Sequence, residues 1–145
     1  MANARLLDRS QVAADLRVRS VLFWLVALIA VGIIVIGARF LLVPLPAAAA
    51  FGVPADGAHT LAYLWAKGTR DIVSGLLLIA LVRIGAGRRV VAVFMAVAAL
   101  IPVGDFLNVY ANEGVGNPVA LTIHGGTAVS MLILAWCLLP REQAH

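Results

Sequence analysis

Long apolar stretches constrain this chain more than any other feature. The first, "VLFWLVALIAVGIIVIGARFLL", covers residues 21–42, and others of about 20 residues follow it. A helix of that length rises about 30 Å, which matches the hydrocarbon core of a bilayer. Only 12% of the residues are charged and 63% are hydrophobic, whereas soluble domains are about 25% charged. The sequence therefore predicts an all-α integral membrane protein.

Four spans are predicted, at about residues 21–42, 59–84, 90–112 and 118–139, in an antiparallel four-helix transmembrane bundle that forms a single domain over residues 1–145. Gly114 is a predicted helix stop, and Asn117 and Pro118 fit an N-cap and a first helical position. Residues 43–57 hold three prolines and two glycines and predict a loop, longer than the usual helix connection. Residues 4–19 predict a short amphipathic interfacial helix or a frayed tail.

The basic residues predict the orientation of the bundle. Eight arginines mark one side: Arg5, Arg9, Arg17, Arg19, Arg83, Arg88, Arg89 and Arg141. By the positive-inside rule, both termini are cytoplasmic and the protein is a multi-pass protein of the inner (plasma) membrane. Because these arginines are scattered over helix ends, the pI near 10.2 does not indicate a nucleic-acid partner. The sequence is compatible with a homo-oligomer.

Polar residues within the spans gather at one depth. Counted from the basic edge at 1.5 Å per residue, Asp71 is about 18 Å deep, Arg70 about 20 Å, Lys67 and Asp105 about 24 Å, and His124 about 26 Å. Lys67, Arg70, Asp71 and Ser74 share one helical stripe, Asp105, Asn108 and Asn112 a second, and His124, Thr127 and Met131 a third. A charge at the bilayer centre costs at least about 2.5–3.5 kcal/mol. We therefore expect these stripes to face each other around a polar pocket in the outer half of the bilayer.

Other positions refine this prediction. Pro102, three residues before Asp105, should kink the third span, because it leaves the carbonyl of Ala98 without its helical hydrogen bond. Arg39, about 30 Å from the basic edge, should snorkel to the outer surface rather than join the pocket. The single cysteine, Cys137, excludes an internal disulfide, and the sequence has no metal-ligand spacing and no nucleotide-binding motif.

The polar residues also carry a resemblance. With Gly68, Arg70, Asp71, Gly75, Asp105 and the "IHGGTA" segment at His124, residues 20–140 resemble a family of small four-helix membrane proteins of unknown function. A looser similarity is to styrene oxide isomerases, which share a proline-rich first loop and an Asp and Asn on the third span, here Asp105 and Asn108. That similarity implies haem as a possible cofactor, bound through a histidine for which His59 is the nearest candidate.

Three functions fit the predicted pocket. The first is binding or conversion of a small lipophilic molecule by isomerase- or cyclase-like acid–base chemistry. Asp71 and Asp105 would then donate and accept the proton, and His124 would shuttle it. Lys67 and Arg70 would bind an oxyanion, and Ser74, Asn108 and Thr127 would contact the ligand. The second is a proton-coupled transporter or channel, and the third is a structural membrane subunit whose polar stripe holds helices together.

Overall fold

The computed structural model describes residues 20–53 and 60–139, and all of the regular elements there are α-helices. The prediction of an all-helical bundle is confirmed. The helices are α2 (Val21–Leu42), α3 (Pro44–Phe51), α4 (Thr60–Arg83), α5 (Arg88–Ala98), α6 (Leu100–Glu113) and α7 (Pro118–Leu138). The long helices agree with the four predicted stretches to within two residues at each end, with the third divided into α5 and α6. Residues 4–19, the predicted amphipathic segment, lie outside the described residues.

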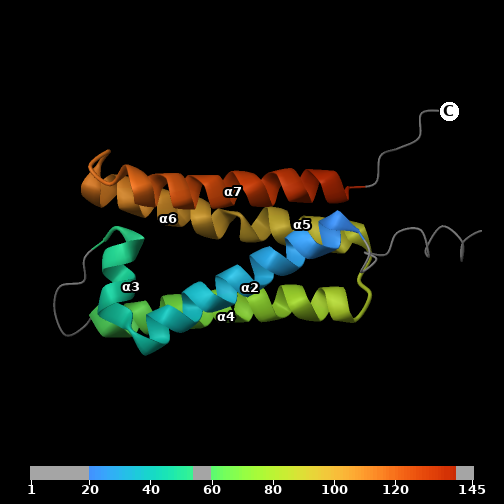
Figure 1. The fold of residues 1–145 in the computed structure, drawn as a ribbon, viewed down its shortest axis with the longest axis horizontal. Helices are drawn as coiled ribbons and strands as arrows, with labels where there is room; N and C mark the ends of the chain where they lie inside the picture. The colour runs from blue at the N-terminus through green and yellow to red at the C-terminus, as the bar shows by residue number, and fades with distance from the viewer. Residues whose placement is uncertain (1–19, 54–59, 140–145) are drawn as a thin grey trace, which may run out of the picture.

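The helices form two layers (Figure 1). In one layer α2 packs along α4, and in the other α7 packs along α5 and α6. The start of α2, the end of α4, the start of α5 and the end of α7 lie at the same end of the bundle, so neighbouring long helices run antiparallel. The short helix α3 stands across the opposite end, where it closes the space between the layers.

Glycines determine how closely α2 and α4 approach. A Cβ added at Gly37 would lie 2.6 Å from the Gly68 carbonyl oxygen, and one at Gly68 would lie 2.7 Å from the Gly37 oxygen. At Gly75 an added Cβ would lie 2.7 Å from the Ala30 oxygen. Only hydrogen fits at these three positions. Close backbone approach through small residues is a usual way for helices to associate in lipid, so α2 and α4 form one tightly packed pair.

The connection after α2 differs from the prediction. Residues 43–57 were expected to form a loop, but Pro44–Phe51 form α3. Pro44 stands in the first turn, where its missing N–H costs nothing, and four alanines with high helix propensity follow it. Gly52 ends the helix with a left-handed φ of 100°. Pro44 therefore starts this helix instead of preventing it.

The third predicted span is interrupted where the sequence predicts a kink. The α-helical pattern breaks at Ala99, between α5 and α6, one turn before Pro102. Proline provides no N–H for the carbonyl four residues earlier. The break thus separates the part of this span that packs at the basic end from the part that carries Asp105.

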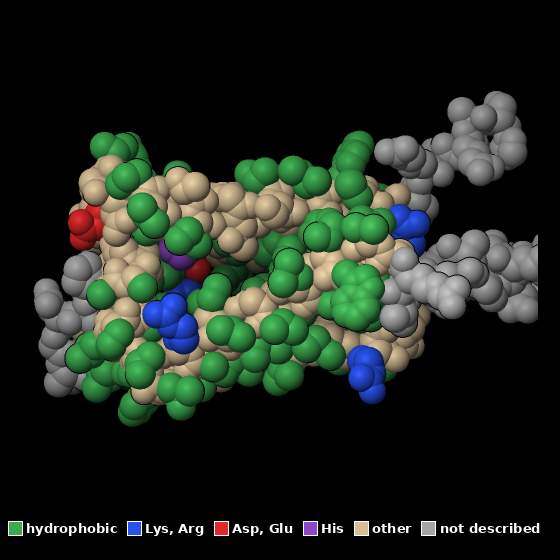
Figure 2. Space-filling model, viewed as in Figure 1, with side chains coloured by type: hydrophobic (Ala, Val, Ile, Leu, Met, Phe, Trp, Pro, Cys, Tyr) green, Lys and Arg blue, Asp and Glu red, His purple; other side chains and the backbone are tan. Residues whose placement is uncertain are grey.

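The surface of the bundle suits a lipid environment. Among residues 20–53 and 60–139, three helical stretches are long and apolar enough to cross a membrane: Val21–Leu42, Arg88–Glu113 and Pro118–Leu138. They indicate a multi-pass membrane protein. The helix α4 is less apolar, because it contains Lys67, Arg70 and Asp71 in addition to Arg83. Large apolar side chains such as Leu28, 68% exposed, cover the outside (Figure 2).

Candidate functional site

A cavity of about 70 Å³ lies between the two layers. All five long helices contribute to its lining. The lining residues are Ile33 and Ile36 of α2, Lys67, Asp71, Ser74 and Leu78 of α4, Phe94 and Ala98 of α5, Ile101, Pro102 and Asp105 of α6, and Ile123, His124, Thr127 and Met131 of α7. The polar stripes that the sequence predicts on α4, α6 and α7 therefore contribute to one site.

Two cations and two carboxylates form a compact cluster at this cavity. Lys67 Nζ lies 3.1 Å from Asp71 Oδ2 and 3.0 Å from Asp105 Oδ2, so it bridges α4 and α6. Arg70 contacts Asp71 Oδ1 at 3.0 Å and Asp105 Oδ1 at 3.4 Å. Every carboxylate oxygen has a cationic partner, and the four formal charges sum to zero. Mutual pairing of this kind allows ionised groups to lie within a membrane span.

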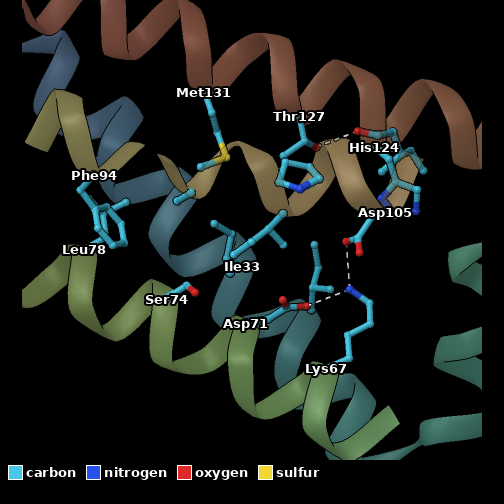
Figure 3. A pocket seen from close by; sticks show the side chains of 15 residues that line it. Ile33, Lys67, Asp71, Ser74, Leu78, Phe94, Asp105, His124, Thr127 and Met131 are labelled. Carbon is cyan, nitrogen blue, oxygen red and sulfur yellow. Dashed lines mark hydrogen bonds and ion pairs between the residues drawn. The ribbon is translucent and has the colours of Figure 1, made fainter. Parts of the chain in front are cut away.

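The burial of the four groups is unequal. The Asp71 side chain is 5% exposed, those of Lys67 and Asp105 are each 14% exposed, and that of Arg70 is 43% exposed. Asp71 is therefore the anchor of the cluster, whereas Arg70 covers it from the outside. In Figure 3, Lys67 extends from α4 between Asp71 and Asp105, and the dashed lines join it to both.

Two aromatic rings also lie close to the Lys67 ammonium. Its Nζ lies 4.9 Å from the centroid of the Phe40 ring and 4.5 Å from that of Phe51. Both distances are within the range of a cation–π interaction. The two rings meet edge to face at 5.9 Å. An ammonium has three N–H donors, of which two point to carboxylates.

His124 is oriented by α3. Its Nε2 lies 3.1 Å from the Phe51 carbonyl oxygen, and its ring packs on the Phe51 ring at 4.5 Å. A carbonyl oxygen only accepts, so Nε2 carries the proton and Nδ1 of the neutral ring holds a lone pair. Within the described part of the chain, Nδ1 has no hydrogen-bond partner. When its ring is neutral, His124 therefore has Nδ1 as its proton-accepting atom, on the wall of the cavity.

The cavity has a polar end and an apolar end. Figure 3 shows Lys67, Asp105 and His124 at one end, and Leu78, Phe94 and Met131 at the other. Leu78 and Met131 belong to the same buried core cluster, against which Phe94 packs. A ligand that fills this space would place a small polar group at the charged cluster and hydrocarbon along the rest.

The remaining predicted site residues divide into two groups. Ser74 and Thr127 line the cavity, although their hydroxyls donate within their own helices, to the Arg70 and Ile123 carbonyls at 2.8 and 2.7 Å. Asn108 lies outside it and accepts from Asn112 at 2.9 Å. Asn108 instead lines a second hollow, towards α3, which shares Lys67 and Asp105 with the cavity. The Lys67–Asp105 pair therefore stands between the two spaces.

Phe40 and Phe51 are site residues that the sequence analysis missed. Phe40 lies in the first predicted span and Phe51 in the predicted loop, where an aromatic residue resembles any other apolar one. A cation expected at the same level as nearby rings is the signal that could have suggested them.

No metal centre is evident among residues 20–53 and 60–139, where no three His, Cys, Asp or Glu side chains are placed to hold an ion. The haem candidate His59 lies outside the described residues.

Comparison with protein families shows to which family the chain belongs. Residues 30–138 match the family model described as a domain of unknown function, DUF4267. The chain belongs to this family. Since the match runs from α2 to the end of α7, the DUF4267 region contains every residue of the cavity and its charged cluster. No curated protein and no solved structure matches the chain. The similarity to styrene oxide isomerases accordingly finds no support in these comparisons.

Proposed function

We propose that this protein binds a small lipophilic molecule with one polar group and converts it by acid–base chemistry that leaves its composition unchanged, as in an isomerisation or cyclisation. The observation that carries the proposal is the two-ended cavity, in which a charged cluster and a histidine base border an otherwise apolar space. A purely structural polar network needs no cavity beside it, and a mainly apolar cavity with a few converging polar groups is the usual form of a ligand site.

The cluster suggests a division of roles. Both carboxylates are fully engaged by Lys67 and Arg70, so Asp71 and Asp105 fix the position of the ammonium. The remaining N–H of Lys67 is the available donor for a ligand oxygen, where it would stabilise negative charge that develops during the reaction. His124, with its Nδ1 lone pair, is the available proton acceptor. Proton transfer from a carbon of the ligand to Nδ1, and back to another atom, would isomerise the molecule without a co-reactant.

Ligand-induced stabilisation tests the proposal. Purified protein in one detergent is heated with a panel of small lipophilic alcohols, ketones and epoxides, and its melting temperature is followed by tryptophan fluorescence. A ligand at 100 times its Kd stabilises by about 2.7 kcal/mol, so a true ligand shifts the transition by several degrees. Compounds that shift it are then incubated with the protein and examined by mass spectrometry for products of unchanged mass.

Thr127→Phe and Val129→Phe form a matched pair for this test. Thr127 lines the cavity, whereas Val129 lies two residues away on the same helix and is 55% exposed. Thr127→Phe should abolish the shift and Val129→Phe should retain it. If no compound shifts the transition, or if both variants respond like the wild type, the ligand-binding proposal is wrong. Proton flux through reconstituted vesicles, lost in Asp71→Asn, would favour the transporter instead.

A further inference from the structure

The opening of the cavity lies between α2 and α7, on a face that is mainly apolar and carries a basic side chain beside the hollow (Figure 2). Figure 2 shows a hollow between the two layers with acidic and histidine side chains at its base. Ile36 of α2 and Ile123 of α7 line the cavity and are 46% and 52% exposed. Both helices are apolar enough to cross a membrane. An opening part-way along two such helices faces acyl chains instead of water.

A shallow groove continues from this opening along the same two helices. It is lined by Leu25, Leu28 and Ile29 of α2 and by Gly126, Ser130 and Leu134 of α7. It shares Ile123 and Thr127 with the cavity, so the two spaces join. From Ile123 to Leu134 the groove extends about 16 Å, which is close to half of the roughly 30 Å hydrocarbon core. That length corresponds to a chain in one leaflet.

The size and charge of the cavity limit the head group. A space of about 70 Å³ is several times the roughly 10–15 Å³ that one water requires, so it admits a small polar group but no long chain. The cluster beside it has no net charge, because two carboxylates already balance Lys67 and Arg70. A further ionised group buried there would lack a counter-ion and would be strongly disfavoured.

We infer that the ligand is an uncharged long-chain lipid with one small oxygen-bearing head, such as a fatty alcohol, aldehyde or epoxide, and that it enters sideways from the bilayer between α2 and α7. This inference rests on the proposed function and names the ligand class and its route. The head lies at Lys67 and His124, and the chain lies in the groove. Because lipid is as apolar as the groove, the head supplies the selectivity and the groove determines the access.

Photolabelling tests the ligand and its position. The probe is hexadecanol with a diazirine in the middle of its chain, added to the full-length protein in phosphatidylcholine nanodiscs. Labelled peptides should come mainly from the groove segments of α2 and α7. Unlabelled hexadecanol should suppress this labelling, whereas palmitate or hexadecyl phosphate at the same mole fraction should not. Labelling spread evenly over the lipid-facing helices, or suppression by the charged lipids, would overturn the inference.

Gly126 and Gly104 provide a matched pair for the route. A Cβ added at either glycine meets nothing within 4 Å, but Gly126 lines the groove, whereas Gly104 lines neither the groove nor the cavity. Gly126→Phe should lower the specific labelling at least about tenfold, since a bound chain would have to displace the new ring. Gly104→Phe should leave it unchanged. Equal labelling of both variants would contradict entry through the groove.

The failure of this inference is distinguishable from that of the proposed function. If a short lipophilic alcohol still stabilises the wild type and the Gly126→Phe variant equally, while the long-chain probe labels no preferred segment, the cavity binds ligands but the inferred class and route are wrong. If neither compound binds, the proposed function falls as well, and the inference falls with it.

Discussion

Replacing each carboxylate of the charged cluster by its amide should have unequal effects. Asp71→Asn and Asp105→Asn both keep the shape of the side chain, and both leave the cluster with one excess positive charge. Their surroundings differ, however. Asp71 is 5% exposed and lies 3.1 and 3.0 Å from its two cations, whereas Asp105 is 14% exposed and lies 3.0 and 3.4 Å from them.

The burial of each carboxylate and of its cationic partners determines how much stability each substitution should cost. Removal of one partner from a buried ion pair costs about 3–5 kcal/mol, and this range applies to Asp71, whose loss deprives both cations of their most buried partner. After Asp105→Asn, Lys67 keeps Asp71, and Arg70 is 43% exposed, where a pair contributes only about 0–1 kcal/mol. We therefore expect Asp105→Asn to destabilise by roughly 1–3 kcal/mol, less than Asp71→Asn.

The assay is the free energy of unfolding of both variants in the same detergent, alone and combined with Lys67→Met. Removing the Lys67 charge restores neutrality in either background, so each amide should cost less in the Lys67→Met protein than in the wild type. If Asp105→Asn destabilises as much as Asp71→Asn, the ranking by burial is wrong. If the costs simply add, the cations and carboxylates are not coupled as the distances indicate.

Three further predictions follow from other features. Reporter fusions at the C-terminus should be active only as cytoplasmic reporters, and activity of a periplasm-only reporter there would overturn the predicted orientation. Gly68→Ala should separate α2 from α4 and destabilise the protein by about 1–3 kcal/mol. Gly104→Ala, where the added Cβ meets open space, should be neutral or should stabilise the protein by up to about 1 kcal/mol. Equal unfolding free energies of the two variants would contradict the close packing of α2 on α4. Nitrogen-15 NMR of His124 should show protonated Nε2 and unprotonated Nδ1 at pH 8, and a Nδ1-protonated tautomer would show that the Phe51 carbonyl does not orient the ring.

Helix boundaries and the common level of the polar residues along the bundle follow from the sequence for simple reasons. A bilayer fixes how many apolar residues a helix needs, and a constant rise per residue converts sequence position into height. Counting residues from the basic edge therefore predicts that Lys67, Asp71, Asp105 and His124 lie at one level. In the structure, all four line one cavity. Height does not give the direction of a side chain, however, and Asn108 turns to Asn112 instead of the cavity.

The part that sequence reasoning missed depends on tertiary packing. Residues 43–57 have the composition of a loop, and their prolines do not reveal that one of them begins a helix. Since α3 lies across the end of the bundle, it brings Phe51 next to both Lys67 and His124. No local pattern encodes a contact between residues this far apart in the chain. The same holds for Phe40, whose ring is one of many apolar side chains on α2.

Because the bundle is built of two layers, the width of the cavity depends on the distance between these layers. Each layer is packed within itself, α2 on α4 and α7 on α5 and α6, whereas contacts between the layers are sparser. The cavity lies at that interface, where the Lys67–Asp105 pair joins the two layers and the His124–Phe51 contact joins α7 to α3. A change in the lateral pressure of the membrane would therefore alter the spacing between the layers more readily than the packing within either one. Thickness and packing of the surrounding bilayer would thereby adjust how far the site stands open.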